Sequence, residues 1–237
     1  MDNSKQLGAP VPDWTPPPVP CRERLEGRYA KLEPLDADAH AALLFNEFQG
    51  HDTLWDYMPD GPFASSSQLH RRLRDNAADP SLDFYAIRDL DTGRLGGVAS
   101  FLRIAPAAGS IELGFITLAP CLQGTRAATE AFFVMMDWAF TAGYRRFEWK
   151  CNALNMASRR AAQRLGLSYE GVFRQAAVVK GRNRDTAWFA ATDADWPALR
   201  EAYAVWLNPA NFDGQARQRE SLSDLTALVR VASDPVL

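Results

Sequence analysis

Apolar residues recur along this chain with two different periods, and the changes between them mark the predicted elements. From Asp36 to Phe48 the apolar positions Ala39, Leu43 and Leu44 follow helical spacing, whereas residues 83–88 alternate between apolar and polar as a strand does. The same criteria predict helices over 65–79, 126–143, 155–165 and 196–206, with 222–231 as a further candidate. They predict strands over 29–32, 83–88, 95–104, 111–118, 146–151, 169–179 and 186–191.

Capping and turn residues set the boundaries of these elements. Asp36 or Asp38 can cap the first helix, Gly50 ends it, and the run Ser65-Ser66-Ser67 can cap the second helix. A turn over 181–183 predicts that the last two strands form a hairpin. The order strand, helix, helix, three strands, helix, strand, helix, two strands needs one parallel crossover within an antiparallel meander. The expected fold class is therefore α/β (α+β), a mixed, mostly antiparallel sheet of roughly seven strands with helices on both faces.

The two ends of the chain differ in composition from its centre. Six prolines between Pro10 and Pro20 favour an extended arm over residues 1–24, and Trp14 is expected to anchor it to the domain or to a partner subunit. One folded domain is expected over 25–192, followed by a helical extension over 193–237. A length of 237 residues with 47% hydrophobic composition suits one such domain with extensions.

The net charge, the cysteine content and the apolar runs limit the partners, metals and location expected for the protein. A net charge of -3 lacks the cationic excess of a nucleic-acid or anionic-membrane binder, so neither partner is expected. The three cysteines have no metal-ligand spacing, which predicts reduced thiols and no metal. The polar start has no secretory signal, and no run of about 18 apolar residues follows, which predicts a cytoplasmic protein.

One short segment has the character of an anion site. The strand ending at Leu118 is followed by a turn of small and polar residues and by a helix that begins near Arg126. Free backbone N–H groups at the positive end of a helix can hold a phosphate. Many helices begin with small residues for structural capping alone, so both interpretations stay open. The turn is neither the lysine-containing phosphate loop nor the dinucleotide-binding loop.

Three motifs together resemble a known family. They are Gln123-Gly124-Thr125-Arg126-Ala127-Ala128-Thr129-Glu130-Ala131, Asn155-x-x-Ser158 and Arg164-Leu165-Gly166-Leu167. With the order of elements, they resemble the GNAT acyltransferases, specifically the RimJ/RimL-like branch, over roughly residues 28–191. The coenzyme A loop of that family reads Gln/Arg-x-x-Gly-x-Gly/Ala, which aligns Gln123 with its first position and Ala128 with its last. Arg126 stands where glycine is usual and would bring a cation beside the phosphates.

The resemblance implies that acetyl-CoA binds as a cosubstrate. Its pyrophosphate would lie on the Gln123 turn, and its pantetheine arm would meet residues 115–118, where two strands splay and an amide could polarise the thioester carbonyl. Asn155 matches the family asparagine that contacts the coenzyme, with a helix cap as the alternative. The coenzyme-binding residues implied are Phe115, Ile116, Thr117, Leu118, Gln123, Gly124, Thr125, Arg126, Ala127, Ala128, Thr129, Asn155 and Arg164.

Two residues are candidates for the proton transfers that amine acylation needs. In RimL-like enzymes an acidic residue beside the coenzyme slot is taken as the base, and Glu112 lies on that strand, although it could be a solvent-facing carboxylate. Ser158 resembles the serine of RimL-like enzymes and is the candidate acid, because Ala162 stands where many GNAT enzymes have tyrosine. Ser158 could equally be a first-turn helix residue. Cys151 is a candidate nucleophile for a covalent acyl-enzyme intermediate. We discount this role because enzymes of the family that the chain resembles usually transfer the acyl group directly.

The acceptor side is expected at the aromatic loop over 51–63 and the last hairpin. Asp56 and Asp60 could recognise a cationic amine or be solvated carboxylates, and Arg184 with Asp185 could instead form a cross-strand ion pair. The candidate substrate-binding residues are Trp55, Tyr57, Asp60, Arg184 and Trp188.

The function that the resemblance implies is direct acyl transfer from acetyl-CoA to a primary amine of a small molecule or of a peptide or protein N-terminus. Two alternatives remain. One is a non-catalytic acyl-CoA-binding or interaction module, which the departures at Arg126 and Ala162 permit. The other is an acyltransferase with another donor, such as succinyl-CoA. A homodimer is only the family expectation, and fold analogy cannot choose the acceptor.

Overall fold

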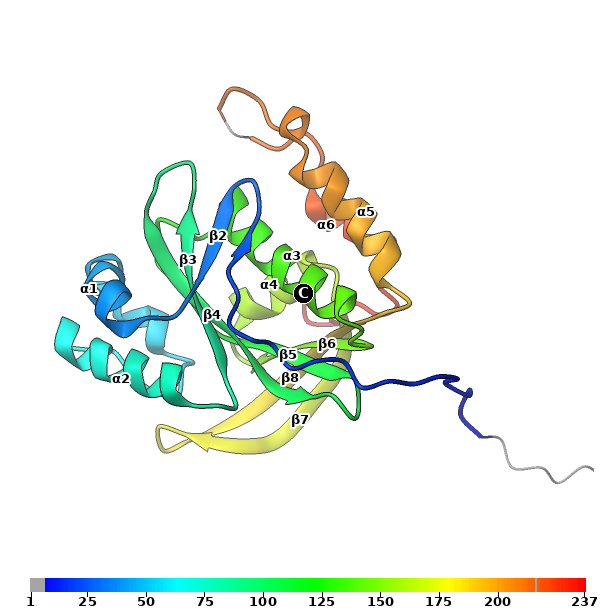
Figure 1. Ribbon diagram of the computed structural model, residues 1–237, viewed down its shortest axis with the longest axis horizontal. Coiled ribbons are helices and arrows are strands. Elements are labelled where there is room, and N and C mark those ends of the chain that lie inside the picture. Colours follow the sequence, from blue (N-terminus) through cyan, green and yellow to red (C-terminus); the bar gives the residue numbers. More distant parts are fainter. Residues whose placement is uncertain (1–6, 216) are drawn as a thin grey trace, which may run out of the picture.

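An eight-stranded sheet organises the chain, whose computed structural model describes residues 7–215 and 217–237 (Figure 1). The strands lie in the order β1-β2-β3-β4-β5-β6-β8-β7, and β5 with β6 is the one parallel pair in the described sheet. Their bounds are β1 (Leu25–Glu26), β2 (Ala30–Pro34), β3 (Asp83–Asp89), β4 (Leu95–Ala105), β5 (Ser110–Leu118), β6 (Arg146–Asn152), β7 (Ser168–Val179) and β8 (Arg182–Thr192). The predicted mixed sheet is confirmed, and the two-residue strand β1, paired with β2, makes the eighth strand.

Helices cover both faces of the sheet (Figure 1). α1 (Ala37–Phe48) and α2 (Ser66–Ala78) pack on one face over β3 and β4, where Phe48, Leu69 and Phe84 share an apolar core. The other face carries α3 (Arg126–Thr141), α4 (Met156–Arg164), α5 (Trp196–Leu207) and α6 (Leu222–Ala227). Two short 3-10 helices, η1 (Asp52–Trp55) and η2 (Pro209–Asn211), complete the description. No helix in residues 7–215 and 217–237 has both the length and the apolar character to cross a membrane.

Local signals placed most element ends correctly. The Asp36 carboxylate accepts from the amides of Asp38 and Ala39 at the start of α1, and Ser65 caps α2. The last hairpin turn begins at Lys180, one residue earlier than expected. Lys180 and Gly181 both adopt positive φ, as the type I′ two-residue hairpin turn requires.

The final helix is shorter than the predicted 222–231. It ends at Ala227, beyond which Leu228 and Val231 are exposed, so no buried apolar face continues there.

A buried carboxylate fixes α3 to the edge of the sheet. Glu130 Oε1 accepts a hydrogen bond from the amide of Arg28 at 2.9 Å. Its Oε2 accepts from the amides of Tyr29 at 2.5 Å and Ala30 at 2.8 Å. The turn between β1 and β2 therefore directs its free N–H groups at the first half of α3. This contact holds the end of α3 on which the candidate site is built.

Both ends of the chain pack on the domain. Trp14 packs against Gly109, and the Arg145 guanidinium carbon lies 5.6 Å from the centroid of the Trp14 ring. The arm therefore contacts its own domain. The first six residues of the predicted arm lie outside the described residues. At the other end, Arg159 of α4 donates to both carboxylate oxygens of Asp234 at 2.6 Å, which ties the C-terminal segment to α4.

Replacement of Glu130 by alanine is expected to lower the free energy of unfolding by about 3 kcal/mol, because three N–H groups, two of them buried, lose their acceptor. Urea denaturation of both proteins measures the difference. The control is Glu201→Ala on the exposed side of α5, which should change stability by less than about 0.5 kcal/mol. Equal stabilities for the two variants would show that Glu130 does not hold the β1–β2 turn.

Candidate active site

β5 and β6 pair only over their first halves and then separate. The parallel register runs from Ser110 opposite Arg146 to Leu113 opposite Trp149, whereas β5 continues to Leu118. Phe115 adopts a φ of 49°, and the β4–β5 register shifts between Val98 and Ser100. These irregularities change the direction of β5, as β-bulges do. The backbone edge of residues 114–118 that faces β6 is therefore left without a strand partner, as the resemblance implied.

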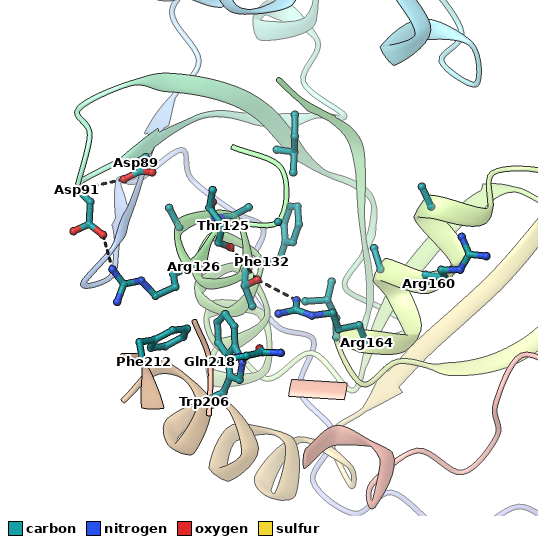
Figure 2. Close-up of a pocket in the computed structure, with 18 of the residues that line it drawn as sticks. Asp89, Asp91, Thr125, Arg126, Phe132, Arg160, Arg164, Trp206, Phe212 and Gln218 are labelled. Atoms are coloured by element: carbon teal, nitrogen blue, oxygen red, sulfur yellow. Dashed lines mark hydrogen bonds and ion pairs between the residues drawn. The ribbon is translucent and has the colours of Figure 1, made fainter. Parts of the chain in front are cut away.

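A cavity of about 740 Å³ lies between α3, α4 and the C-terminal extension (Figure 2). Thr125 caps α3, its Oγ1 accepting from the amide of Ala128 at 3.1 Å, and Gly124 turns the chain into the helix with a φ of 71°. The predicted coenzyme residues that line this cavity are Leu118, Gly124, Thr125, Arg126, Ala127, Ala128, Thr129 and Arg164.

Two predicted coenzyme residues, Gln123 and Thr117, line neither cavity. The Gln123 side chain donates through Nε2 to the carbonyl of Leu118 at 2.8 Å and so braces the turn from outside. Thr117 is buried within β5.

Two arginines at the larger cavity differ in their charge compensation. Arg126, at the position where glycine is usual, lies 3.0 Å from Asp91 and between the rings of Tyr29 and Phe212, at 4.5 and 4.8 Å. The Asp91 carboxylate therefore neutralises the Arg126 guanidinium.

Arg164 has no such counter-ion. It donates to the Thr129 hydroxyl at 3.1 Å and lies 5.0 Å from the Trp206 ring centroid, and within the described residues it forms no ion pair with an acid. Burial lowers the pKa of Arg164. A half-buried cation that faces a cavity with neutral partners alone favours an anionic ligand.

A second cavity, of about 290 Å³, adjoins the splayed part of β5 and gathers the proton-transfer candidates. Tyr57 closes one side, its hydroxyl donating to the carbonyl of Leu154 at 3.2 Å, so the loop over 51–63 meets the β6–α4 connection. The predicted site residues that line this cavity are Tyr57, Glu112, Phe115, Ile116, Asn155, Ser158 and Arg184.

Glu112 is a buried member of an ion-pair network. Its side chain is 5% exposed, which excludes the solvent-facing alternative. Glu112 Oε2 lies 2.8 Å from Arg103 Nη1 and 2.9 Å from Lys150 Nζ. The Lys150 ammonium also meets Glu148 at 2.8 Å and lies 3.6 Å from the Trp188 ring centroid. Sequence reasoning missed Arg103 and Lys150, although alternation along β6 places Glu148 and Lys150 on one face of the sheet.

Ser158 and Asn155 begin α4 at the wall of this cavity. The Ser158 hydroxyl accepts a hydrogen bond from Trp149 Nε1 at 2.9 Å, which leaves its own proton free for donation. Asn155 Oδ1 accepts from the Ser158 amide at 3.0 Å, so Asn155 is the cap of α4 as well as a cavity residue.

Three predicted substrate residues do not line the smaller cavity. Trp55 is buried with Phe48 and Phe63 at ring distances of 5.6 and 4.9 Å, because the loop uses its aromatic rings as a local core. Asp60 forms an ion pair with Arg72 of α2. Trp188 serves as the platform beneath the Lys150 ammonium. Aromatic loop composition thus indicated a packed loop as much as a binding surface.

Within the described residues, no group of three or more His, Cys, Asp or Glu could hold a metal ion.

Comparison with known proteins assigns the chain to a family. The acetyltransferase (GNAT) domain profile matches residues 30–168. A GCN5-related N-acetyltransferase from Brucella melitensis is 41% identical, with a TM-score of 0.89 over 92% of this chain and 100% of its own. A protein described as a probable acetyltransferase (GNAT family), from Chromobacterium violaceum ATCC 12472, is 36% identical, with a TM-score of 0.78 over 84% and 100%. The chain is a GNAT acetyltransferase.

The structural neighbours include enzymes of the RimL type. One, from Salmonella typhimurium, modifies the N-terminal serine of the 50S ribosomal subunit protein L7/L12. It is 22% identical, with a TM-score of 0.62 over 72% of this chain and 99% of its own, a likeness that shows the fold alone. No protein with a curated description matches the chain.

Alkylation at neutral pH is expected to label Cys21 much faster than Cys151, since only thiolates react. Cys21 is exposed, whereas Cys151 is buried and its burial raises the pKa of the thiol. Mass spectrometry of peptides after timed treatment with iodoacetamide gives the two rates. Faster labelling of Cys151 would indicate an activated thiol and reopen the covalent mechanism.

Proposed function

We propose that the protein transfers the acetyl group of acetyl-CoA directly to a primary amine of a small molecule or of a peptide N-terminus. The observation that carries this proposal is that the two cavities meet the same strand, β5, at its splayed end. Leu118 lines the larger cavity, while Phe115 and Ile116 line the smaller one. A coenzyme that lies along this edge would have its phosphates at α3 and its thioester beside Glu112.

The lining of the larger cavity supports binding of the phosphates and of the nucleotide end of the coenzyme. The N–H groups in the first turn of α3 and the Arg164 guanidinium would hold the pyrophosphate. The C-terminal extension supplies Trp206, Phe212 and Gln218 to the same cavity. Trp206 donates from Nε1 to Gln218 Oε1 at 2.8 Å, which fixes the indole that lies against Arg164. The extension would thereby form one wall for the nucleotide end of the coenzyme.

The smaller cavity offers groups for each proton movement. The amine nitrogen would bond to the thioester carbonyl carbon, an unpaired amide of β5 would stabilise the oxyanion, and the C–S bond would then break. Glu112 would take the proton of the attacking ammonium through water, and Ser158 would protonate the leaving thiolate. Asn155, at the cap of α4, would be positioned to contact the coenzyme near its thioester.

Arg164→Gln is expected to weaken coenzyme A binding roughly tenfold or more, because a charge-assisted hydrogen bond to phosphate is lost. Isothermal titration calorimetry with coenzyme A measures the affinity. The matched control is Arg71→Gln on exposed α2, which removes the same charge far from the cavity and should leave the affinity unchanged. Undetectable coenzyme binding by the unmodified protein would overturn the proposed function itself.

Glu112→Gln is expected to lower kcat about 100-fold or more without loss of coenzyme affinity, because proton removal fails while the cavity keeps its shape. An acceptor for the assay is found by mass spectrometry of extract incubated with labelled acetyl-CoA. Glu148→Gln is the control, since Glu148 also meets Lys150 but does not line the smaller cavity. An equal loss in both variants would mean that the carboxylates act only by positioning Lys150.

A further inference from the structure

A chain of alternating charges crosses the polar face of β5, β6 and their neighbours. Each consecutive pair in it lies between 2.5 and 2.9 Å apart, so three cations and three carboxylates neutralise one another. Its members, in order, are Glu170, Arg146, Glu148, Lys150, Glu112 and Arg103. The one acid on the smaller cavity, Glu112, is therefore engaged by two cations already.

Arg184 stands outside this network. It lines the smaller cavity from β8, its Nε is buried without a hydrogen-bond partner, and no ion pair joins it to an acid within the described residues. The neighbouring Asp185 is engaged elsewhere, since its Oδ1 accepts from the Gln175 amide at 2.7 Å and from Asn183 at 3.0 Å. The cross-strand ion pair of Arg184 and Asp185 that the sequence left open is thus not formed between these two described residues.

The charge of Arg184 acts on the interior of the cavity. Burial raises the pKa of the Cys151 thiol, and Arg184 is among the cations that oppose this rise. A half-buried guanidinium with an unsatisfied N–H is costly unless an anion completes it. The cavity volume of about 290 Å³ is at the lower end of small-molecule pockets, roughly 300–1,000 Å³. Cavity size and charge together indicate a small anionic partner.

We infer that the acceptor is a small amine that also carries an anionic group, a carboxylate or phosphate, and that Arg184 binds this group while the amine faces the thioester. This inference rests on the proposed function and narrows its acceptor to zwitterions of the amino-acid type. Both ion pairs of Glu112 are made through Oε2, so Oε1 is the oxygen left for the amine. Arg184 discriminates against acceptors of equal size without the negative charge.

Matched pairs of acceptors test this assignment. Common amino acids and their carboxamides, together with aminoalkyl phosphates and the corresponding amino alcohols, are assayed for acetyl transfer. The expected result is a preference for the anionic member of about tenfold or more in kcat/KM. In Arg184→Gln the preference should disappear, chiefly through a higher KM for the anionic member. Arg182→Gln, on the exposed end of the same strand, should retain it.

Coenzyme titration separates this inference from the proposed function. Arg184→Gln should bind coenzyme A with unchanged affinity, which also shows that the variant is folded. Equal use of charged and neutral acceptors, a preference retained by Arg184→Gln, or acetylation of longer peptides but of no small amine would each overturn the inference. All three results would leave coenzyme-dependent acetyl transfer intact, whereas loss of coenzyme binding by the unmodified protein contradicts the function as well.

Discussion

The separation of β5 from β6 beyond Leu113 and Trp149 is the constraint on which the site depends. A fully paired sheet would satisfy its own backbone groups and leave no edge for a ligand. The positive φ of Phe115 and the shifted β4 register hold β5 in its new direction. With the edge exposed, both cavities acquire their common wall, and the N-terminus of α3 is brought to one end of it by the buried Glu130 carboxylate.

Charge compensation distinguishes the structural cations from those available to ligands. Arg126 and Lys150 both line cavities, yet each has at least one carboxylate partner and an aromatic ring against it. Arg164 and Arg184 line the same two cavities without an acidic partner in the described structure. Sequence position alone would have favoured Arg126, since it lies in the turn that resembles the coenzyme loop of the family. Because Asp91, on the turn between β3 and β4, neutralises Arg126, Arg164 is the better candidate of the two for an anionic ligand.

The C-terminal extension packs against the helices of the larger cavity and also lines that cavity, which its position in the chain does not indicate. Its helix α5 stacks Trp196 and Tyr203 against Phe133 of α3, and Tyr203 donates to the carbonyl of Leu165 at the end of α4. It therefore buttresses the two helices that form the larger cavity. Trp206 and Phe212 then line the larger cavity, so the same extension packs on α3 and α4 and forms a wall of that cavity.

The sequence by itself determined the elements, their order and the turn at the start of α3, because periodicity, caps and helix ends depend on neighbours within a few residues. The helix start near Arg126 and the strand that carries Glu112 follow from such local patterns, whereas the place of Glu112 beside a coenzyme slot was implied by the family resemblance. Only the tertiary structure decided which side chains meet: Asp91 with Arg126, Lys150 with Glu112, and Trp206 with Arg164. It also placed Trp55 in a core and left Arg184 without an ion pair to any acid in residues 7–215 and 217–237. Periodicity shows which face a residue occupies, whereas its partner depends on the register and packing of elements distant in the chain.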